Sequence, residues 1–302
     1  MKPPPLRYSR PESVTEALTT LAGFGPDAKV LAGGQSLVPL LSMRLAAPLH
    51  LVDINRLASL SYVTVADGQV RVGALARHAQ VLASPAAQAA QPLLAKALRC
   101  VAHPAIRNRG TTVGSIVHAD PAGEMPAVLA LLGGKVRVAS TEGERLVPAS
   151  EFFLGMLESA VQPRELATEV LFPALPQTAG TGFAEVSRRR GDYAVCGVAA
   201  IVRLGTDGRL VSALAAYLSV AACPLVLDLT DAVAGAAAGD ADLSAAARMA
   251  RDRIDPEPDI HATAGYRRHL AGVLTERALL EALDEAGRRA RQEPRETPGE
   301  AA

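Results

Sequence analysis

The sequence predicts an α+β protein with two successive domains, and three observations support this class. Strand and helix patterns alternate through residues 13–172, so the first part combines both kinds of element. The Pro- and Gly-rich stretch 173–182 interrupts these patterns, and strands followed by helices come after it. With 302 residues, the chain has room for about two domains of average size.

The composition is that of a folded protein with no preference for a polyanionic partner. Hydrophobic residues make up 49% of the chain and charged residues 21%, close to the averages for folded domains. Lys and Arg total 31 and Asp and Glu total 31, so the formal net charge is +0. Aromatic residues are only 3%. No nucleic-acid partner is therefore expected, because the chain offers neither a basic field nor a base-stacking surface.

The N-terminal part is expected to form a small α/β unit. Ser13 is a typical helix N-cap, and Glu16 three residues later suits a capping box. Pro48 should end the second helix of this unit. The expected elements are a helix from 13 through 21, a strand at 29–32, a glycine turn at 33–36, a helix at 37–45 and a strand at 49–54.

A β-hairpin and several helices are expected next. Asp67-Gly68 separates two alternating apolar runs, which is a strong signal for a hairpin turn. Gly133-Gly134 follows an apolar helix pattern and should terminate that helix. Helices are expected at 81–84, 93–101 and 126–132, with a strand at 135–139 that pairs through Glu142-Gly143 with the segment after it.

The second domain should consist of strands followed by helices. Asp207-Gly208 is expected to join two of its strands. The expected elements are strands at 195–204 and 210–218 and helices at 241–254 and 264–286. Residues 288–302 lack apolar periodicity and are expected to form a disordered tail.

Two glycine-bearing segments have the chemistry of phosphate sites. The first segment (residues 32–37) lies between a strand and a helix, where glycines allow backbone N–H groups to approach an anion. The second segment (residues 111–115) is again small and rich in hydroxyl groups. Neither has the G-x-G-x-x-G spacing, so a dinucleotide would be held differently from a Rossmann fold. Taken alone, the first segment is more typical of an ordinary tight turn than of a phosphate site.

Several other sites are not supported by the sequence. Cys100, Cys196 and Cys223 are widely separated and predict neither disulfides nor a metal site, which favours a reduced, cytoplasmic setting. His103 and His118 lack suitable neighbours for a metal centre. No apolar run is long enough to predict a membrane span, and the first residues lack the apolar region of a signal peptide.

Four motifs, found in one order, resemble those of a known flavoprotein family. They are LAGGQSLVP (31–39), LVDI (51–54), RNRGTTVGSIVHADP (107–121) and GFAEVSRRRGDYA (182–194). Together they are similar to the FAD-binding medium subunit of the molybdenum hydroxylases, the xanthine dehydrogenase family, and most of all to its carbon monoxide dehydrogenase branch. The resemblance extends from about Tyr8 to Ala286.

The resemblance implies a fold and a domain division. Residues 1–176 would form an FAD-binding domain of the PCMH type, made of two α/β subdomains that divide near residue 57. Residues 177–287 would form a C-terminal α+β domain of the carbon monoxide dehydrogenase flavoprotein type, with a three-stranded sheet and helices.

The resemblance also implies roles for individual residues. Asp120 and Glu124 would bind toward the ribose and ribityl part of FAD, and Tyr193 would lie near the isoalloxazine ring. The FAD pyrophosphate would be held by Ala32, Gly33, Gly34, Gln35, Ser36 and Leu37 of the first segment and by Thr111, Thr112, Val113, Gly114 and Ser115 of the second.

The second segment departs from the family pattern at Val113, where the family usually has glycine. A β-branched residue is disfavoured at φ > 0, so we expect a locally rebuilt loop in which Val113 has an ordinary β-region conformation. Thr112 also departs from the usual isoleucine, which fits a rebuilt loop.

The expected function is electron transfer within a heterotrimeric oxidoreductase. FAD would receive electrons from iron–sulfur clusters of a small partner subunit, which takes them from a large molybdopterin-binding subunit, and would pass them to an external acceptor. Three scattered cysteines are too few to hold a 2Fe–2S cluster in this chain. Two alternatives are a self-contained FAD oxidase or reductase, and a non-catalytic assembly protein that has lost its flavin.

Overall fold

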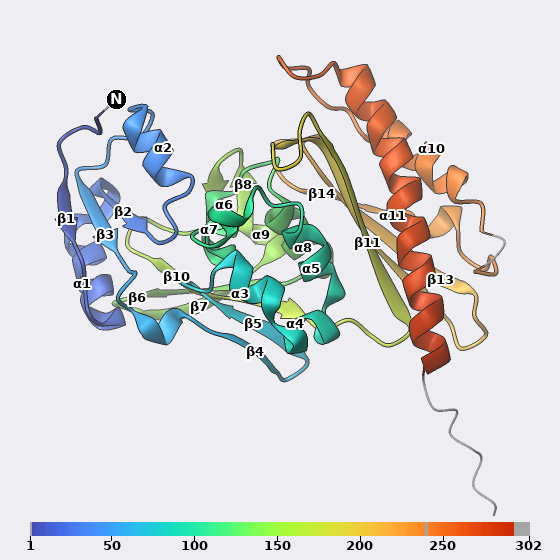
Figure 1. Ribbon diagram of the computed structural model, residues 1–302, viewed down its shortest axis with the longest axis horizontal. Coiled ribbons are helices and arrows are strands. Elements are labelled where there is room, and N and C mark those ends of the chain that lie inside the picture. Colours follow the sequence, from blue (N-terminus) through green and yellow to red (C-terminus); the bar gives the residue numbers. More distant parts are fainter. Residues whose placement is uncertain (1, 239–240, 293–302) are drawn as a thin grey trace, which may run out of the picture.

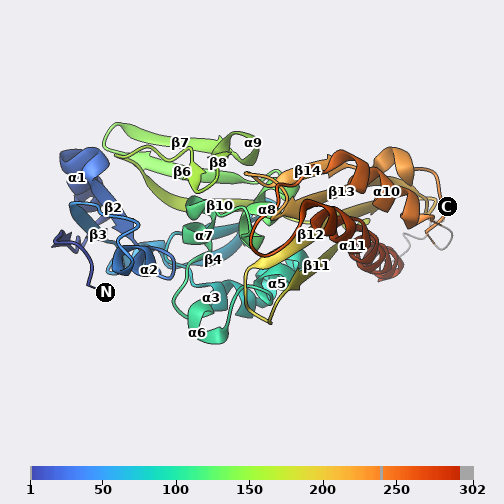
Figure 2. The same cartoon turned by 90° about the horizontal axis from the view of Figure 1, so that it is seen from above.

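A computed structural model describes residues 2–238 and 241–292 of the chain. Three units, each built on one sheet, follow one another along the longest axis of the molecule (Figure 1). The view from above shows the same order, from the small N-terminal sheet to the C-terminal sheet and its helices (Figure 2). This arrangement confirms the predicted α+β class.

The first unit is a three-stranded parallel sheet in the order β1-β3-β2, packed with two helices. Ser13 Oγ accepts a hydrogen bond from the Glu16 N–H at 3.1 Å, so the predicted N-cap is confirmed. The Glu16 carboxylate accepts from the N–H of Glu12 instead of completing the box at Ser13. The elements are β1 (Arg7–Ser9), α1 (Val14–Phe24), β2 (Ala28–Leu31), α2 (Leu37–Ser42) and β3 (His50–Asp53).

Helix α2 is shorter than the sequence predicts. The sequence pattern extends to residue 45, but the helix ends at Ser42, because Arg44 has a left-handed backbone with φ 60°. The first segment therefore leads into a helix of less than two turns.

The second, central unit is a five-stranded antiparallel sheet in the order β4-β5-β10-β6-β7. The predicted hairpin at Asp67-Gly68 is confirmed, and both residues have positive φ, as the tight turn requires. The strands are β4 (Val63–Ala66), β5 (Gln69–Gly73), β6 (Lys135–Ser140), β7 (Gly143–Pro148) and β10 (Leu166–Pro173), with a separate small hairpin of β8 (Phe153–Gly155) and β9 (Glu158–Ser159).

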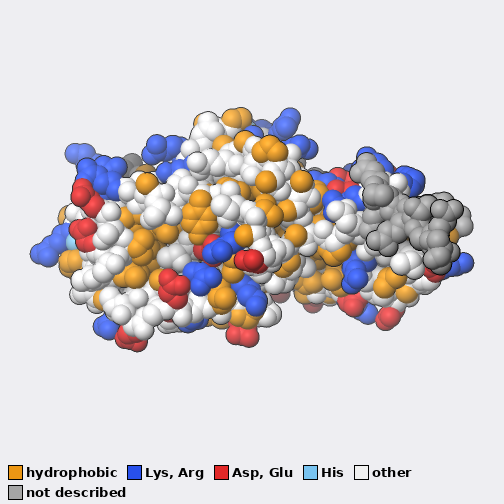
Figure 3. Space-filling view, turned by 90° about the horizontal axis from the view of Figure 1, so that it is seen from below, with side chains coloured by type: hydrophobic (Ala, Val, Ile, Leu, Met, Phe, Trp, Pro, Cys, Tyr) orange, Lys and Arg blue, Asp and Glu red, His pale blue; other side chains and the backbone are white. Residues whose placement is uncertain are grey.

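Helices cover one face of this sheet, and the other face is polar. The covering elements are α3 (His78–Ala83), α4 (Pro85–Ala90), α5 (Pro92–Leu98), α6 (Pro104–Arg107), α7 (Thr112–His118), α8 (Glu124–Leu132) and α9 (Ala149–Phe152). Val72, Val136 and Val170 point into the core beneath them. On the opposite face Glu169 pairs with Arg71 and Arg137. The space-filling view of the lower side of the molecule accordingly shows acidic and basic side chains intermingled (Figure 3).

The third unit is a four-stranded antiparallel sheet in the order β11-β12-β13-β14. The resemblance implied three strands, and the short β14 adds a fourth. The elements are β11 (Ala179–Ser187), β12 (Ala194–Leu204), β13 (Leu210–Leu218), β14 (Leu225–Asp228), α10 (Leu243–Arg253) and α11 (Ala264–Gln292). The expectation of a tail from residue 288 is wrong for 288–292, which continue α11, and residues 293–302 lie outside the described residues.

Both faces of the C-terminal sheet are buried. Helix α11 packs along β11, where a Cβ at Gly182 would overlap the backbone of Ala278, so only glycine allows this approach. On the other face, Ala199 and Ala216 join the core of the central unit beneath α8. The C-terminal unit therefore rests directly against the helices that follow the second segment.

Candidate functional site

The first segment is a glycine turn with free backbone donors. It follows β2, and Gly34 has φ 73°, a conformation that favours glycine. Gln35 folds back and donates from Nε2 to the carbonyl of Gly33 at 3.0 Å. Ser36 is the N-cap of α2 but forms no side-chain cap bond. Within the described residues, the N–H groups from Gly33 to Leu37 donate to no protein acceptor.

The second segment is the start of a helix, which corrects the prediction of a loop. Thr111 is the N-cap of α7, and its hydroxyl accepts a hydrogen bond from the Gly114 N–H at 3.1 Å. Thr112 is fully buried, and its hydroxyl lies 3.1 Å from His78 Nδ1. Burial lowers the pKa of His78 to about 4, helped by the charge of Arg107, so this imidazole is neutral at pH 7. Ser115 continues the helix by bonding to the carbonyl of Thr111.

Val113 is helical, which corrects the expected β-region conformation. It is the second residue of α7, and its side chain is 2% exposed in the core of the central unit. A helical φ carries no strain for valine. Valine can therefore replace the glycine that the family usually has here without distorting the backbone. Val113 is not among the residues with positive φ.

The two segments lie in direct contact, although residues 38–110 separate them in the sequence. A Cβ placed on Gly33 would lie 2.6 Å from the carbonyl oxygen of Arg109 and 3.0 Å from the nitrogen of Thr111. A side chain at Gly33 is therefore excluded by the backbone of Arg109, Gly110 and Thr111. The N–H groups of the first segment are thus brought next to the start of the second segment.

The acidic residues and Tyr193 lie at the other end of α7. Ala119 ends this helix in a left-handed conformation, and Asp120 Oδ1 then accepts the N–H of Ala122 at 2.9 Å. Tyr193 lies between β11 and β12 and is 68% exposed. Partial desolvation is the main cause that raises the pKa of Tyr193, and the negative charges of Asp120 and Glu124 add to it. The three residues are therefore close enough to interact electrostatically. The seven residues of α7 span about 10 Å between the two groups.

Glu124 begins α8 in a site that disfavours its charged form. Burial is the main cause that raises its pKa to about 8, and the nearby carboxylates of Glu185 and Asp120 add to the effect. Burial raises the pKa of Glu185, on β11, to about 7, and its Oε2 is buried without a hydrogen-bond partner among the described residues. Glu185 was not predicted as a site residue, although it lies inside the GFAEVSRRRGDYA motif.

Three further residues that the sequence analysis left without a role line the contact between the two segments. Asn55 donates from Nδ2 to the carbonyl of Ala32 at 2.8 Å. Arg77 bonds both to Asn55 and to the carbonyl of Arg109. His78 donates its backbone N–H to the carbonyl of Gly110. The sequence signals were the position of Asn55 just after the LVDI strand and the Arg77-His78 pair after the hairpin.

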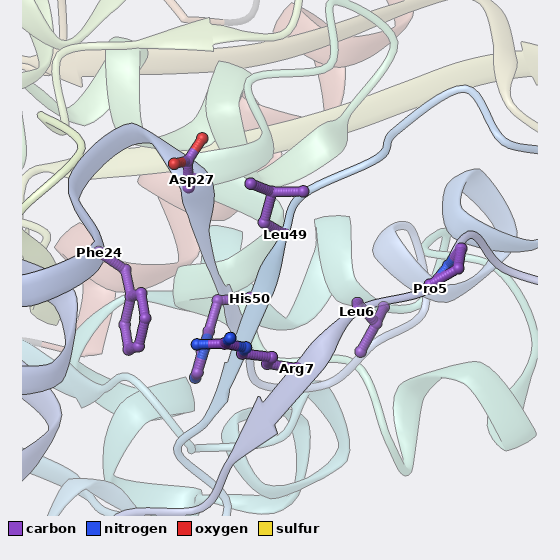
Figure 4. A pocket seen from close by; sticks show the side chains of 7 residues that line it. All are labelled: Pro5, Leu6, Arg7, Phe24, Asp27, Leu49 and His50. Atoms are coloured by element: carbon purple, nitrogen blue, oxygen red, sulfur yellow. The ribbon is translucent and has the colours of Figure 1, made fainter.

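A separate cavity lies at the far edge of the N-terminal sheet. It has a volume of about 530 Å³, and Figure 4 shows Arg7, Phe24 and His50 among its lining side chains. His50 and Phe24 stack with ring centroids 3.8 Å apart. These residues lie at or before the amino ends of β1, β2 and β3, whereas the first segment follows the carboxyl end of β2. The cavity therefore belongs to the opposite edge of the sheet from the two segments.

The donors and acceptors at the two segments fit FAD. Free N–H groups and a glycine cradle suit a pyrophosphate, which is anionic and accepts several hydrogen bonds. The carboxyl groups of Asp120 and Glu124, about one short helix away, suit hydroxyl and amide groups. Among the described residues no three His, Cys, Asp or Glu side chains are grouped as metal ligands, and no helix is both long and apolar enough to cross a membrane.

Comparisons with known proteins identify the family of both domains. Residues 4–175 match the model of the FAD binding domain in molybdopterin dehydrogenase, and residues 181–282 match that of the CO dehydrogenase flavoprotein C-terminal domain.

Two curated relatives cover nearly the whole chain. One is subunit alpha of the 6-hydroxypseudooxynicotine dehydrogenase complex of Paenarthrobacter nicotinovorans, 41% identical over 95% of this chain and 97% of the relative. The other is the carbon monoxide dehydrogenase medium chain of Hydrogenophaga pseudoflava, 36% identical over 92% of this chain and 97% of the relative.

Solved structures agree in fold over the same length. Carbon monoxide dehydrogenase from Hydrogenophaga pseudoflava has a TM-score of 0.88 at 34% identity, covering 94% of this chain and 99% of that one. Quinoline 2-oxidoreductase from Pseudomonas putida 86 has a TM-score of 0.88 at 35% identity, covering 95% and 99%. On this similarity of sequence and fold, the chain belongs to the FAD-binding medium subunits of the molybdenum hydroxylase family.

Proposed function

We propose that this chain is the FAD-binding electron-transfer subunit of a heterotrimeric molybdenum hydroxylase. The observation that carries the proposal is the contact between the two segments, where the free N–H groups of the first segment lie next to the start of the second. Both segments lie within residues 4–175, which match the FAD binding domain in molybdopterin dehydrogenase. Bound FAD would supply reversible one- and two-electron chemistry, while the chain supplies binding, orientation and redox tuning.

The proposed roles follow the positions of the residues. The first and second segments would bind the pyrophosphate, and Asp120 and Glu124 would bind the ribose and ribityl hydroxyl groups. Tyr193 is an exposed tyrosine beside those carboxyl groups, which suits a ring that stacks on or covers the isoalloxazine. No residue is assigned as a general acid or base, because electron transfer by this subunit requires none.

The proposed partners are a large molybdopterin-binding subunit and a small iron–sulfur subunit, with an external electron acceptor. Cys100, Cys196 and Cys223 are all free and far apart in sequence, so this chain does not supply the ligands of a 2Fe–2S cluster. Unpaired cysteines also suit the proposed cytoplasmic location. Within the chain we propose the division into an FAD-binding domain, residues 1–176, and a C-terminal domain, residues 177–287.

The test uses the purified full chain without partners. After incubation with FAD and gel filtration, we expect a yellow protein with about one FAD per chain, which passes electrons to an artificial acceptor after chemical reduction but oxidises no organic substrate. A chain that retains no FAD would contradict the proposal. Substrate turnover by the chain alone would favour the self-contained oxidase or reductase instead.

A further inference from the structure

Two side chains form a bridge between the first and second segments. Arg77 donates from one terminal nitrogen to the carbonyl of Arg109, which is separated from the second segment only by Gly110, at 2.6 Å. Its other terminal nitrogen donates to Asn55 Oδ1, also at 2.6 Å. Asn55 donates in turn from Nδ2 to the carbonyl of Ala32, the first residue of the first segment, at 2.8 Å. We call this chain of bonds the Asn55–Arg77 bridge.

The bridge is anchored at both ends in rigid structure. Asp53, at the end of β3, accepts from the backbone N–H of Asn55 at 2.9 Å and from its Nδ2 at 2.6 Å. Tyr8 on β1 donates to the other carboxylate oxygen of Asp53. The backbone of Arg77 pairs with Thr111 in an isolated β-bridge. The bridge therefore connects the N-terminal sheet to the start of α7 at the level of the two segments.

Arg77 is half-buried, and none of its hydrogen bonds goes to a carboxylate. Burial lowers its pKa, the charge of Arg109 lowers it further, and only the more distant Asp53 opposes them. Removing a cation from water without an adjacent anion is costly, so this position is favourable when a negative group lies nearby. The neighbouring free N–H groups point to the same kind of ligand.

We propose that Arg77 and Asn55 are positioning residues for the FAD pyrophosphate. They hold the two segments at the separation that the pyrophosphate requires, and the Arg77 guanidinium adds a positive charge at this site. This inference rests on the proposed FAD function, and it assigns a role to residues outside both segments.

The test compares the full-length apo-protein with its variants in FAD titrations and thermal melts. R77M removes both the charge and the two hydrogen bonds of the guanidinium group. R77K keeps the charge, but an ammonium group cannot form both bonds in the planar geometry of arginine. N55A removes the hydrogen bond to Ala32. R268M is the matched control, because Arg268 also bonds one backbone carbonyl and one side chain, but between α10 and α11. For R77M we expect the Kd for FAD to rise about tenfold or more. A tenfold rise in Kd equals about 1.4 kcal/mol of binding free energy.

Further measurements separate positioning from mere stabilisation. R77M should show a smaller rise in melting temperature on addition of FAD and a weaker salt dependence of FAD binding, because one screened attraction is lost. R77K should retain the salt dependence while binding FAD less tightly than wild type. The N55A and R77M effects should be non-additive, since both break one bridge. R268M should lower the melting temperature of apo and loaded protein equally.

The outcomes distinguish the two levels of the proposal. If wild type binds FAD and R77M, R77K and N55A all bind it within about twofold of wild type, the bridge has no positioning role and the inference is overturned while the FAD function stands. If wild type itself binds no FAD, the proposed function fails. If R77M does not fold, R77K and N55A decide, and wild-type affinity in both overturns the inference.

Discussion

Gly33 determines how closely the two segments approach. The backbone of Arg109, Gly110 and Thr111 lies within 3.0 Å of the place where a Cβ would be, and backbone cannot rotate away as a side chain does. For G33A we therefore expect the segments to be pushed apart and FAD affinity to fall about tenfold or more. The measurement is an FAD titration of the apo-protein.

The control for this variant is G23A. Gly23 lies in α1, and a Cβ at this position would meet no atom within 4 Å, so alanine there should be neutral or slightly stabilising. Equal FAD affinities for wild type, G23A and G33A would show that the close contact is unimportant for binding.

Glu124 should make the stability of the apo-protein fall as pH rises. Its pKa is raised from 4.5 to about 8, so the folded chain keeps a proton that the unfolded chain releases, and the free energy of unfolding declines between these two pH values. E124Q removes this decline. We expect E124Q to have the same melting temperature as wild type at pH 4 and a melting temperature several degrees higher at pH 8. A domain of this size gains about 2–4 °C in melting temperature for each kcal/mol of unfolding free energy.

The readout is the melting temperature of both proteins across that pH range. Glu185, whose pKa is about 7, should leave a smaller residual decline in E124Q. Parallel curves for wild type and E124Q would mean that Glu124 is not protonated in the folded chain.

At the scale of elements, α7 joins the two halves of the site. Val113 packs in the core on this helix, so V113G would remove a buried side chain and add the helix penalty of glycine. We expect it to destabilise the apo-protein by about 2–4 kcal/mol and to leave FAD binding no tighter. Denaturant unfolding and an FAD titration check both effects, and clearly tighter binding would indicate a strained Val113.

Local signals in the sequence predicted elements well, and long-range contacts explain the failures. The Asp67-Gly68 hairpin and the Gly133 helix end were predictable because each depends on neighbouring residues alone. The second segment looked like a loop because its threonines and Gly114 have low helix propensity, whereas Thr111 capping and the burial of Val113 stabilise the helix. The Asn55–Arg77 bridge was not predictable, because its bonds join residues 22 or more apart.

For the whole molecule, an ion-pair cluster connects the central unit to α11. Glu285 accepts from the N–H and hydroxyl of Thr181 at 2.8 and 2.7 Å and pairs with Lys96 Nζ at 3.0 Å. Burial alone would raise the pKa of Glu285, but the bonds from Thr181 and the charge of Lys96 outweigh it and lower the pKa. The cluster therefore stabilises the fold above the unfolded-state pKa, and this stability is lost as pH falls through the folded-state pKa.

E285Q should accordingly lower the melting temperature at pH 7 and have a smaller effect at about pH 3, because the stability that the Glu285 carboxylate contributes declines as the pH falls through its lowered folded-state pKa. E276Q, which replaces a glutamate elsewhere on α11, is the comparison variant. The same melting deficit for E285Q at both pH values would show that the charge of Glu285 does not stabilise the contact between the units.

The most direct test of the central claim is a crystal structure of the full chain with bound FAD. We expect pyrophosphate oxygens within about 3 Å of N–H groups from the first segment and of donors from the second, with the isoalloxazine toward Tyr193. A pyrophosphate bound by only one segment, or FAD bound at the opposite edge of the N-terminal sheet, would contradict it.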